Sequence, residues 1–168
     1  MISLSAREIA DTTGGEIIAG DEAARVDQVS TDSRAVPKGC VFVALHGDTF
    51  DGHQFLPQAS EQGATVAIVD ANAPAPAGMT VVRVADTRRA LGALARSIRR
   101  KIHRTQVLAI AGSNGKTSTK NLLHSVLSRT LRGTASPKSF NNDIGVPATI
   151  FPVRDDEHDY VILEIGTN

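Results

Sequence analysis

Residues 106–117 read Gln-Val-Leu-Ala-Ile-Ala-Gly-Ser-Asn-Gly-Lys-Thr, and this stretch decides the fold of the chain. Its apolar first half, Gln106–Ala111, has the length and composition of a buried parallel strand. Residues Gly112–Lys116 then form a polar, glycine-rich loop, and Thr117–Thr130 reads as an amphipathic helix. A buried strand that leads through such a loop into a helix is typical of α/β proteins with a parallel sheet.

The loop has the residue types of a phosphate-binding site. Its glycines let backbone N–H groups point at phosphate oxygens, and the positive end of the following helix adds to the attraction. Lys116 would place a positive charge on the β- and γ-phosphates, and the Thr117 hydroxyl is a ligand for Mg²⁺. The first glycine comes later than in the standard pattern, so the loop is shorter. We expect nucleotide contacts, rather than a plain strand–turn–helix connection, from Gly112, Ser113, Asn114, Gly115, Lys116, Thr117 and Ser118.

A second run typical of a buried strand, Tyr160–Ile165, carries an acidic residue near its end, Glu164. A carboxylate at the C-terminal edge of a parallel strand, beside a phosphate loop, is placed to bind Mg²⁺. We therefore expect Thr117 and Glu164 to share the metal. The alternative for Glu164 is a capping or surface glutamate.

The composition is that of an ordinary globular protein and excludes several classes. Of the 168 residues, 41% are apolar and 21% are charged, which excludes disorder and collagen. No apolar run approaches the length of a membrane span, and residues 1–8 carry charge where a signal peptide needs an apolar run. The single cysteine, Cys40, cannot form an internal disulfide, and the balanced charge does not favour nucleic acid. We expect a soluble cytoplasmic protein.

The charge is distributed unevenly, which predicts two modules. Residues 1–85 hold 5 Lys and Arg against 11 Asp and Glu, whereas residues 86–168 hold 13 against 7. We place the seam near Val84–Thr87, so that residues 1–85 form a small mixed α/β domain and residues 86–168 begin a Rossmann-like parallel-sheet domain. Each βα unit takes about 30 residues, which leaves too few after the seam for a five-stranded sheet. The chain therefore reads as a truncated piece of a longer enzyme.

Hydrophobic periodicity and turn residues give the remaining elements. Ser5 and Glu8 form a capping box that opens a helix ending at Gly14. Asp86 caps a helix over Thr87–Lys101, which has one apolar stripe and a basic face that we interpret as solvated. Further strands are predicted at Glu16–Ile18, Val26–Val29, Cys40–Leu45, Thr65–Val69 and Val81–Val84, and further helices at His53–Gln62 and Ile144–Phe151.

Four segments together resemble the Mur ligases, the cytoplasmic amide ligases of peptidoglycan synthesis. They are Ser30–Arg34, Gly47–His53, Ser113–Lys120 and Ser139–Pro147, in the family's order over nearly all of the chain. The run Asn-Asn-x-Ile-Gly-Val-Pro in the last segment favours a member that adds D-alanyl-D-alanine over the sister ligase that adds the third amino acid. Two positions depart from the family pattern, because Ala111 and Ser118 stand where threonine is usual. The family's central-domain histidine, modified lysine and carboxy-terminal domain would lie beyond residue 168.

The resemblance implies an ATP-dependent ligase whose small-molecule substrates are UDP-MurNAc-tripeptide and D-alanyl-D-alanine. ATP would phosphorylate the terminal carboxylate of the tripeptide, and the amine of D-alanyl-D-alanine would then displace phosphate from the acyl phosphate. Lys116 would be the catalytic residue that stabilises the transferring phosphoryl group, with Mg²⁺ as the second cofactor. Asn141 and Asn142 would bind nucleotide or substrate, although turn-forming asparagines are an equal alternative. We expect a monomer that is inactive as this piece alone.

The resemblance also makes residues 1–85 the UDP-substrate-binding domain. Ser30, Thr31, Asp32, Ser33 and Arg34 would contact uridine and diphosphate, with Arg34 as the charge partner; without the resemblance they read as an ordinary polar turn. Gly47, Asp51 and His53 form the second substrate segment, although His53 is equally consistent with a structural role. The remaining histidines show no metal-ligand spacing with one another or with the cysteine, so we do not expect histidine to bind metal; they are His46, His103, His124 and His158.

Two other classes of function stay open from the sequence. One is a P-loop NTPase or kinase of another kind, which would need no acidic amino-terminal module. The other is a binding module that recognises a UDP-sugar or nucleotide without chemistry. Substitution of Lys116 by alanine separates these functions in part. Loss of ATP binding with retained binding of the UDP substrate would indicate two distinct sites.

Overall fold

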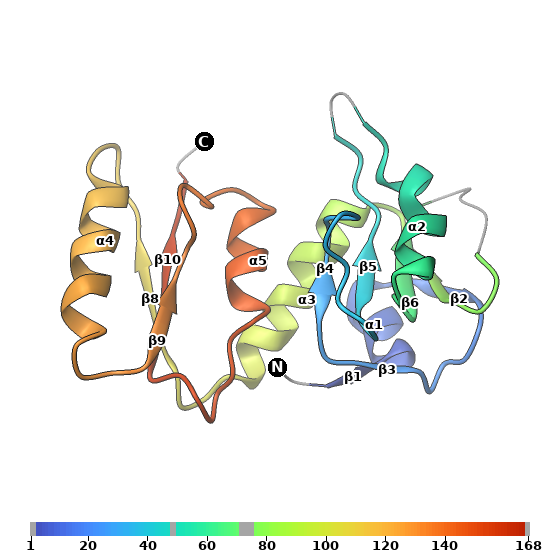
Figure 1. The fold of residues 1–168 in the computed structure, drawn as a ribbon, viewed down its shortest axis with the longest axis horizontal. Coiled ribbons are helices and arrows are strands. Elements are labelled where there is room, and N and C mark those ends of the chain that lie inside the picture. Colours follow the sequence, from blue (N-terminus) through green and yellow to red (C-terminus); the bar gives the residue numbers. More distant parts are fainter. Residues whose placement is uncertain (1–2, 48–49, 71–75, 167–168) are drawn as a thin grey trace. The chain divides into compact units, whose positions relative to one another are not determined.

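The computed structural model describes residues 3–47, 50–70 and 76–166, and the chain divides into two compact units. One unit extends to Leu94 and the other begins at Ala95, so the division falls inside the helix α3, Thr87–Lys101 (Figure 1). This helix has the predicted bounds, and its Asp86 cap is present because Asp86 Oδ1 accepts from the Arg89 N–H at 3.0 Å. It remains a proposal that residues 1–85 bind the UDP substrate and residues 86–168 bind ATP. Among the described residues, no helix is long and apolar enough to cross a membrane.

The first unit is built around a five-stranded sheet with the strand order β2-β7-β6-β5-β4. Its β4, β5, β6 and β7 strands run parallel, and β2 pairs antiparallel with β7. The small strands β1 and β3 pair separately. The elements of this unit are β1 Leu4–Ser5, α1 Ala6–Thr13, β2 Glu16–Ala19, β3 Arg25–Val26, β4 Val29–Ser30, β5 Val41–Val43, η1 Gly52–Phe55, α2 Leu56–Glu61, β6 Val66–Val69 and β7 Thr80–Arg83.

Local sequence explains how this unit begins and what fills its core. The predicted capping box is present: the Glu8 N–H donates to Ser5 Oγ at 3.1 Å, and Glu8 Oε2 accepts from the Ser5 N–H at 2.8 Å. The helix ends at Gly14 in a left-handed conformation with φ 67°, which glycine adopts without strain. All residues of β5 and β6 are buried, as expected for central strands covered on both faces. The core is aliphatic, with Phe42 as its large aromatic side chain.

The second unit holds a three-stranded parallel sheet with the order β8-β10-β9. Its elements are β8 Gln106–Ile110, α4 Lys116–Leu127, β9 Gly133–Ala135, α5 Gly145–Ile150 and β10 Tyr160–Glu164. The strand–loop–helix order of residues 106–127 is the predicted one, and the α/β fold class is confirmed. The Asp155 carboxylate anchors the start of β8, because it accepts from the N–H groups of His103, Arg104 and Thr105. These hydrogen bonds lower the pKa of Asp155 to about 2.

The structure corrects three expectations about the elements. Strand β8 was expected to be buried, but it lies at a sheet edge and its residues are half-buried or exposed. Strand β9 was not predicted, because Gly133–Ala135 is short and has no apolar alternation. The predicted helix over His53–Gln62 is the 3₁₀ turn η1 followed by α2, with Pro57 in the first turn of α2. The apolar side chains of Leu122 and Val126 on α4 are 67% and 56% exposed.

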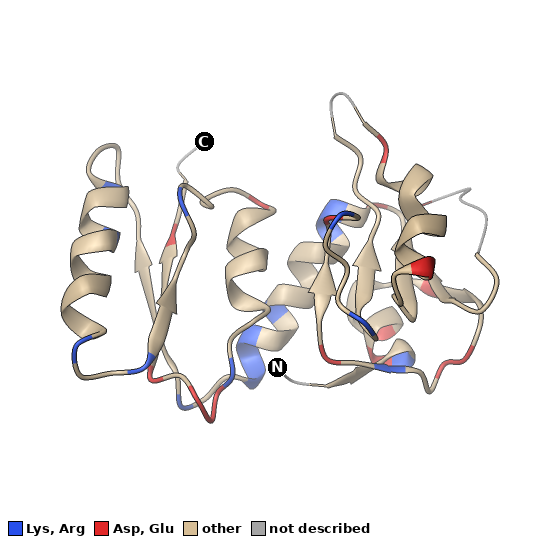
Figure 2. Ribbon diagram, viewed as in Figure 1, with Lys and Arg blue, Asp and Glu red and all other residues tan. Residues whose placement is uncertain are grey.

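The basic side chains of α3 lie on the helix face that the sequence predicted to be solvated. Figure 2 shows Lys and Arg recurring along α3. The apolar stripe of that helix is buried, including Leu91 and Ile98, whereas Arg88, Arg89, Arg96, Arg99 and Arg100 are exposed. The basic face is therefore solvated, as predicted.

Candidate nucleotide-binding site

The glycine-rich loop joins the end of β8 to the beginning of α4 and has two residues in the left-handed region. Gly112 has φ 144° and Gly115 has φ 75°, conformations that favour glycine. Gly115 is the N-cap of α4, and its carbonyl accepts the first helical hydrogen bond, from Thr119 N–H at 2.9 Å. The first-turn N–H groups of α4 have no intrahelical acceptor, so the loop presents hydrogen-bond donors and the positive end of a helix together.

Lys116 closes over this loop. Its Nζ atom donates to the Gly112 carbonyl oxygen at 2.7 Å, which spans the loop from its last residue to its first glycine. The ammonium group is therefore held within the loop by the loop's own backbone. An anionic oxygen placed there would be a stronger partner for the ammonium than a neutral carbonyl oxygen.

Glu164 is the last residue of β10 and lies beside the end of β8, because it pairs with Ile110 in the sheet register. Thr117 Oγ1 donates to Glu164 and lies 3.0 Å from Oε1 and 3.1 Å from Oε2. Asn141 Nδ2 donates to Glu164 Oε1 at 3.1 Å. The structure therefore brings together the threonine, glutamate and asparagine that were chosen from separate parts of the sequence.

Lys120 completes the cluster and was not predicted from the sequence as a site residue. Its Nζ atom lies 3.1 Å from Glu164 Oε2, and the side chains of Lys120 and Glu164 are 2% and 1% exposed. Lys120 Nζ also donates to the carbonyl oxygen of Lys138, a residue with a positive φ of 47°. The available signal was the spacing of Lys116 and Lys120, which are four residues apart and so share one helix face.

The surroundings of Glu164 keep it ionised. Burial by itself raises the pKa of this carboxyl, but hydrogen bonds from Lys120, Asn141 and Thr117, with the charge of Lys120, outweigh it. The net result is a pKa below the ordinary value for glutamate. The cluster therefore offers a carboxylate and a hydroxyl oxygen, which are the hard oxygen donors that Mg²⁺ prefers.

The two asparagines of the loop before α5 are used differently. The Asn141 side chain donates to Glu164. The backbone carbonyl oxygen of Asn141 accepts from the Gly166 N–H at 2.7 Å. Asn142 Oδ1 instead accepts from the N–H groups of Ile144 at 3.3 Å and Gly145 at 2.8 Å, which is the turn-forming arrangement. Asn141 is thus part of the Glu164 cluster, and the Asn142 side chain stabilises the start of α5.

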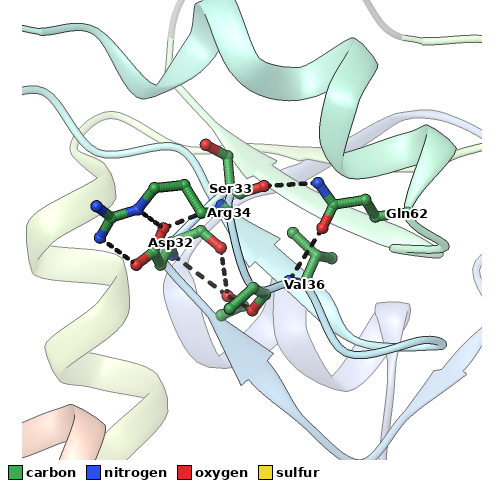
Figure 3. Close-up of polar contacts among 7 residues, drawn as sticks. Asp32, Ser33, Arg34, Val36 and Gln62 are labelled. Carbon is green, nitrogen blue, oxygen red and sulfur yellow. Dashed lines mark hydrogen bonds and ion pairs between the residues drawn. The ribbon is translucent and has the colours of Figure 1, made fainter.

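In the first unit, the residues 30–34 make a tight polar turn after β4 (Figure 3). Arg34 donates to both oxygens of Asp32, from Nε at 2.8 Å and from a terminal nitrogen at 2.6 Å. This pairing lowers the pKa of Asp32 to about 2. The carbonyl of Ser33 accepts from Gln62 Nε2 at 2.8 Å, and Ser30 Oγ accepts from Asp32 N–H at 3.2 Å. The charged side chains of the turn, Asp32 and Arg34, are thus paired with each other, although the Arg34 side chain is 84% exposed.

The second predicted segment follows β5 and folds back on itself. The Gly47 N–H donates to Phe50 O at 2.9 Å, and Asp51 Oδ1 accepts from the His53 N–H at 2.9 Å. Gly52 is required here, because a Cβ at this position would lie 2.7 Å from the backbone N and O of Leu45. Residues 48 and 49 of the predicted segment lie outside the described residues.

Both segments and the end of β6 lie at one edge of the sheet. Strands β4, β5 and β6 are parallel neighbours, so the residues that follow them emerge at the common carboxyl edge. This edge is where open parallel sheets bind ligands.

Comparisons with known proteins agree with the resemblance over the whole chain. Residues 25–99 match the family described as Mur ligase family, catalytic domain, and residues 110–168 match the Mur ligase middle domain. The UDP-N-acetylmuramoyl-tripeptide–D-alanyl-D-alanine ligase of Escherichia coli is 38% identical over 168 residues, which is 100% of this chain and 36% of that protein. A crystal structure of MurF from Acinetobacter baumannii superposes with a TM-score of 0.86 at 35% identity, over 99% of this chain and 36% of that one.

A second solved structure adds a ligand to the comparison. The MurF ligase of Thermotoga maritima, in complex with ADP, has a TM-score of 0.70 at 28% identity, over 83% of this chain and 32% of that one. The chain thus spans about a third of the length of the relatives it matches. The matches to both family descriptions, in the order seen in the sequence, confirm that this chain belongs to the Mur ligase family.

Proposed function

We propose that this chain supplies the nucleotide-binding and sugar-nucleotide-binding parts of an ATP-dependent ligase that joins D-alanyl-D-alanine to UDP-MurNAc-tripeptide. The observation that carries the proposal is the convergence of Lys116, Thr117 and Glu164 at the carboxyl edge of one parallel sheet. The names of the relatives support the substrates, and the ADP complex of one neighbour supports the nucleotide.

In this proposal the loop binds the phosphates of ATP through its backbone N–H groups, and Lys116 exchanges the Gly112 carbonyl for a phosphate oxygen. Residues 112–118 hold the β- and γ-phosphates next to the first turn of α4, with Asn141 at the margin of the site. The protein contributes by positioning the nucleotide and by neutralising its charge.

Thr117 and Glu164 would hold the Mg²⁺ ion, because their hydroxyl and carboxylate oxygens suit this metal and already lie within 3.1 Å of each other. When bound, Mg²⁺ would neutralise part of the negative charge of the nucleotide phosphates. Lys120 Nζ lies 3.1 Å from Glu164 Oε2, so Lys120 acts as a positioning residue that holds the carboxylate in place.

The chemistry would proceed in two steps. The tripeptide carboxylate oxygen attacks the γ-phosphorus, the bond to the ADP oxygen breaks, and an acyl phosphate forms. The uncharged amine of D-alanyl-D-alanine then attacks the acyl carbon, phosphate leaves, and the amine loses its proton as the amide forms. Ser30–Arg34 and Gly47–His53 would hold the UDP end of the substrate at the other unit's carboxyl edge.

The test is binding of ATP and of UDP-MurNAc-tripeptide to the 168-residue chain by isothermal titration calorimetry. Lys116→Ala is expected to abolish ATP binding and to leave binding of the UDP substrate unchanged. Lys101→Ala, an exposed lysine of α3, is the matched control and is expected to keep both. Loss of both ligands in Lys116→Ala would indicate one shared site and contradict the proposal.

A further inference from the structure

A second cluster of ligand-type side chains lies in the first unit, at the carboxyl edge of its parallel sheet. His46 follows β5, His53 lies in η1, and Asp70 follows β6. One ligand atom from each of these three residues lies within 4.8 Å of the others. His46 Nε2 is 3.1 Å from Asp70 Oδ2, and His53 Nε2 is 3.2 Å from Asp70 Oδ1. The two Asp70 oxygens are thus divided between two imidazole rings.

The hydrogen bonds of His53 favour the neutral tautomer that carries its proton on Nδ1. The Asp70 N–H donates to His53 Nε2 at 3.1 Å, so Nε2 is the acceptor nitrogen with the lone pair. In this tautomer His53 Nδ1 carries the hydrogen and donates it to Asp51 Oδ1, 2.6 Å away. An imidazole that donates one N–H to a carboxylate and directs its other nitrogen at a metal is the usual arrangement of metal-binding histidines.

Charge and burial also favour a cation at this position. His53 Nε2 lies 3.2 Å from Asp70 Oδ1, so a cation placed here would be attracted by the imidazole lone pair and by the carboxylate together. With neutral imidazoles, Asp51 and Asp70 give the cluster two negative charges. The His53 side chain is 10% exposed and that of Asp70 is 23% exposed, whereas His46 is 54% exposed, so the cluster is held firmly on one side and open on the other.

We propose that His46, His53 and Asp70 bind a divalent transition-metal ion of the Zn²⁺ class, with Asp51 orienting His53. Two imidazole nitrogens and one carboxylate oxygen form a three-ligand set that suits Zn²⁺, with a fourth position left for water. Magnesium would instead require oxygen donors. Coordination replaces the hydrogen bond from the Asp70 N–H to His53.

Such an ion would add a further link between three segments that backbone hydrogen bonds already bring together. It would connect the residues after β5, the turn η1 and the end of β6, next to the Gly47 and Asp51 positions. The metal site is independent of the phosphate loop, because its residues belong to the other unit.

The proposal is tested with the 168-residue chain after removal of metal by a chelator. Co²⁺ is titrated as a spectroscopic substitute for Zn²⁺, and Zn²⁺ is then added to displace it. The expected result is one Co²⁺ per chain, with visible d–d absorption and nitrogen-ligand charge-transfer features that Zn²⁺ removes. His46→Ala and Asp70→Asn are each expected to abolish the absorption, and Asp51→Asn is expected to weaken binding by about 10–100-fold.

The controls address surface histidines and folding. His103→Ala removes an exposed histidine of the other unit and is expected to bind Co²⁺ as the parent chain does. His46 is the informative position because its exposed side chain can be removed with little effect on folding, which circular dichroism checks. Absence of the d–d absorption in the parent chain, or its persistence in a folded His46→Ala variant, would overturn the proposal.

Discussion

Removal of the buried Lys120 charge is the sharpest test of the cluster around Glu164. In Lys120→Met the Glu164 carboxylate keeps its hydrogen bonds from Thr117 and Asn141 but loses the ammonium group that lies 3.1 Å from Oε2. Both side chains are almost completely buried, so solvent does not compensate. Breaking one side of a buried ion pair costs about 3–5 kcal/mol. The two remaining hydrogen bonds place the expected loss near the lower end, about 3 kcal/mol at pH 7.5.

The sign of the pH dependence follows from the pKa of Glu164. In the parent chain this pKa is lowered, so its stabilising contribution is present above the unfolded value and is lost as the pH falls through the folded value. In Lys120→Met, burial raises the pKa of the carboxyl with less opposition. The variant's Glu164 therefore takes up a proton at a higher pH, and the difference in stability between variant and parent is expected to shrink from pH 7.5 to pH 5.

The assay uses the single tyrosine of the chain. The sequence has one Tyr and no Trp, and Tyr160 is buried on β10, the strand that ends in Glu164. Urea unfolding followed by tyrosine fluorescence thus reports on the unit that contains the cluster. Lys101→Met, in an exposed position, is the matched control and is expected to change the free energy of unfolding by less than about 0.5 kcal/mol.

A loss in Lys120→Met as small as that of the control would refute the reasoning. The double variant Lys120→Met with Glu164→Gln separates pairing from packing, because it removes both charges. It is expected to be more stable than Lys120→Met alone, since no uncompensated charge remains. A double variant in which the two losses simply add would show that the residues do not interact.

Three other predictions follow from single contacts. Glu164→Gln is expected to weaken binding of Mg-ATP much more than binding of metal-free ATP in calorimetry, and equal losses would exclude Glu164 from the metal site. Asp155→Asn is expected to lower the melting temperature at pH 7, because a neutral amide is a weaker acceptor than a carboxylate for the three backbone N–H groups. The difference in melting temperature from the parent chain should fade as the pH decreases toward 2, where Asp155 becomes protonated. Gly52→Ala is expected to destabilise the first unit by about 1–3 kcal/mol, because its Cβ would overlap the Leu45 backbone; an unchanged thermal transition by circular dichroism would contradict this.

The sequence by itself determined the features that depend on neighbouring residues. The capping box at Ser5, the bounds of α3 and the glycine loop before α4 are local patterns, and all are present in the structure. The position of Glu164 at the end of a strand was also predictable, because parallel strands expose their carboxyl ends on one edge. The roles of Lys116 in phosphate binding and of residues 30–34 in substrate binding remain proposals.

Only the tertiary structure decided which distant side chains meet. From the sequence, Lys120 is expected to be an exposed helix residue. In the structure it is buried, because its ammonium group contacts Glu164 of β10 and the Lys138 carbonyl oxygen. His46 and Asp70 show no shared spacing in the chain, yet the adjacent strands β5 and β6 bring them within 3.1 Å. The position of β8 at a sheet edge likewise depends on strand order. The physical reason is that local patterns fix helices, turns and strands, whereas buried charge pairs and ligand clusters arise from sheet topology and burial.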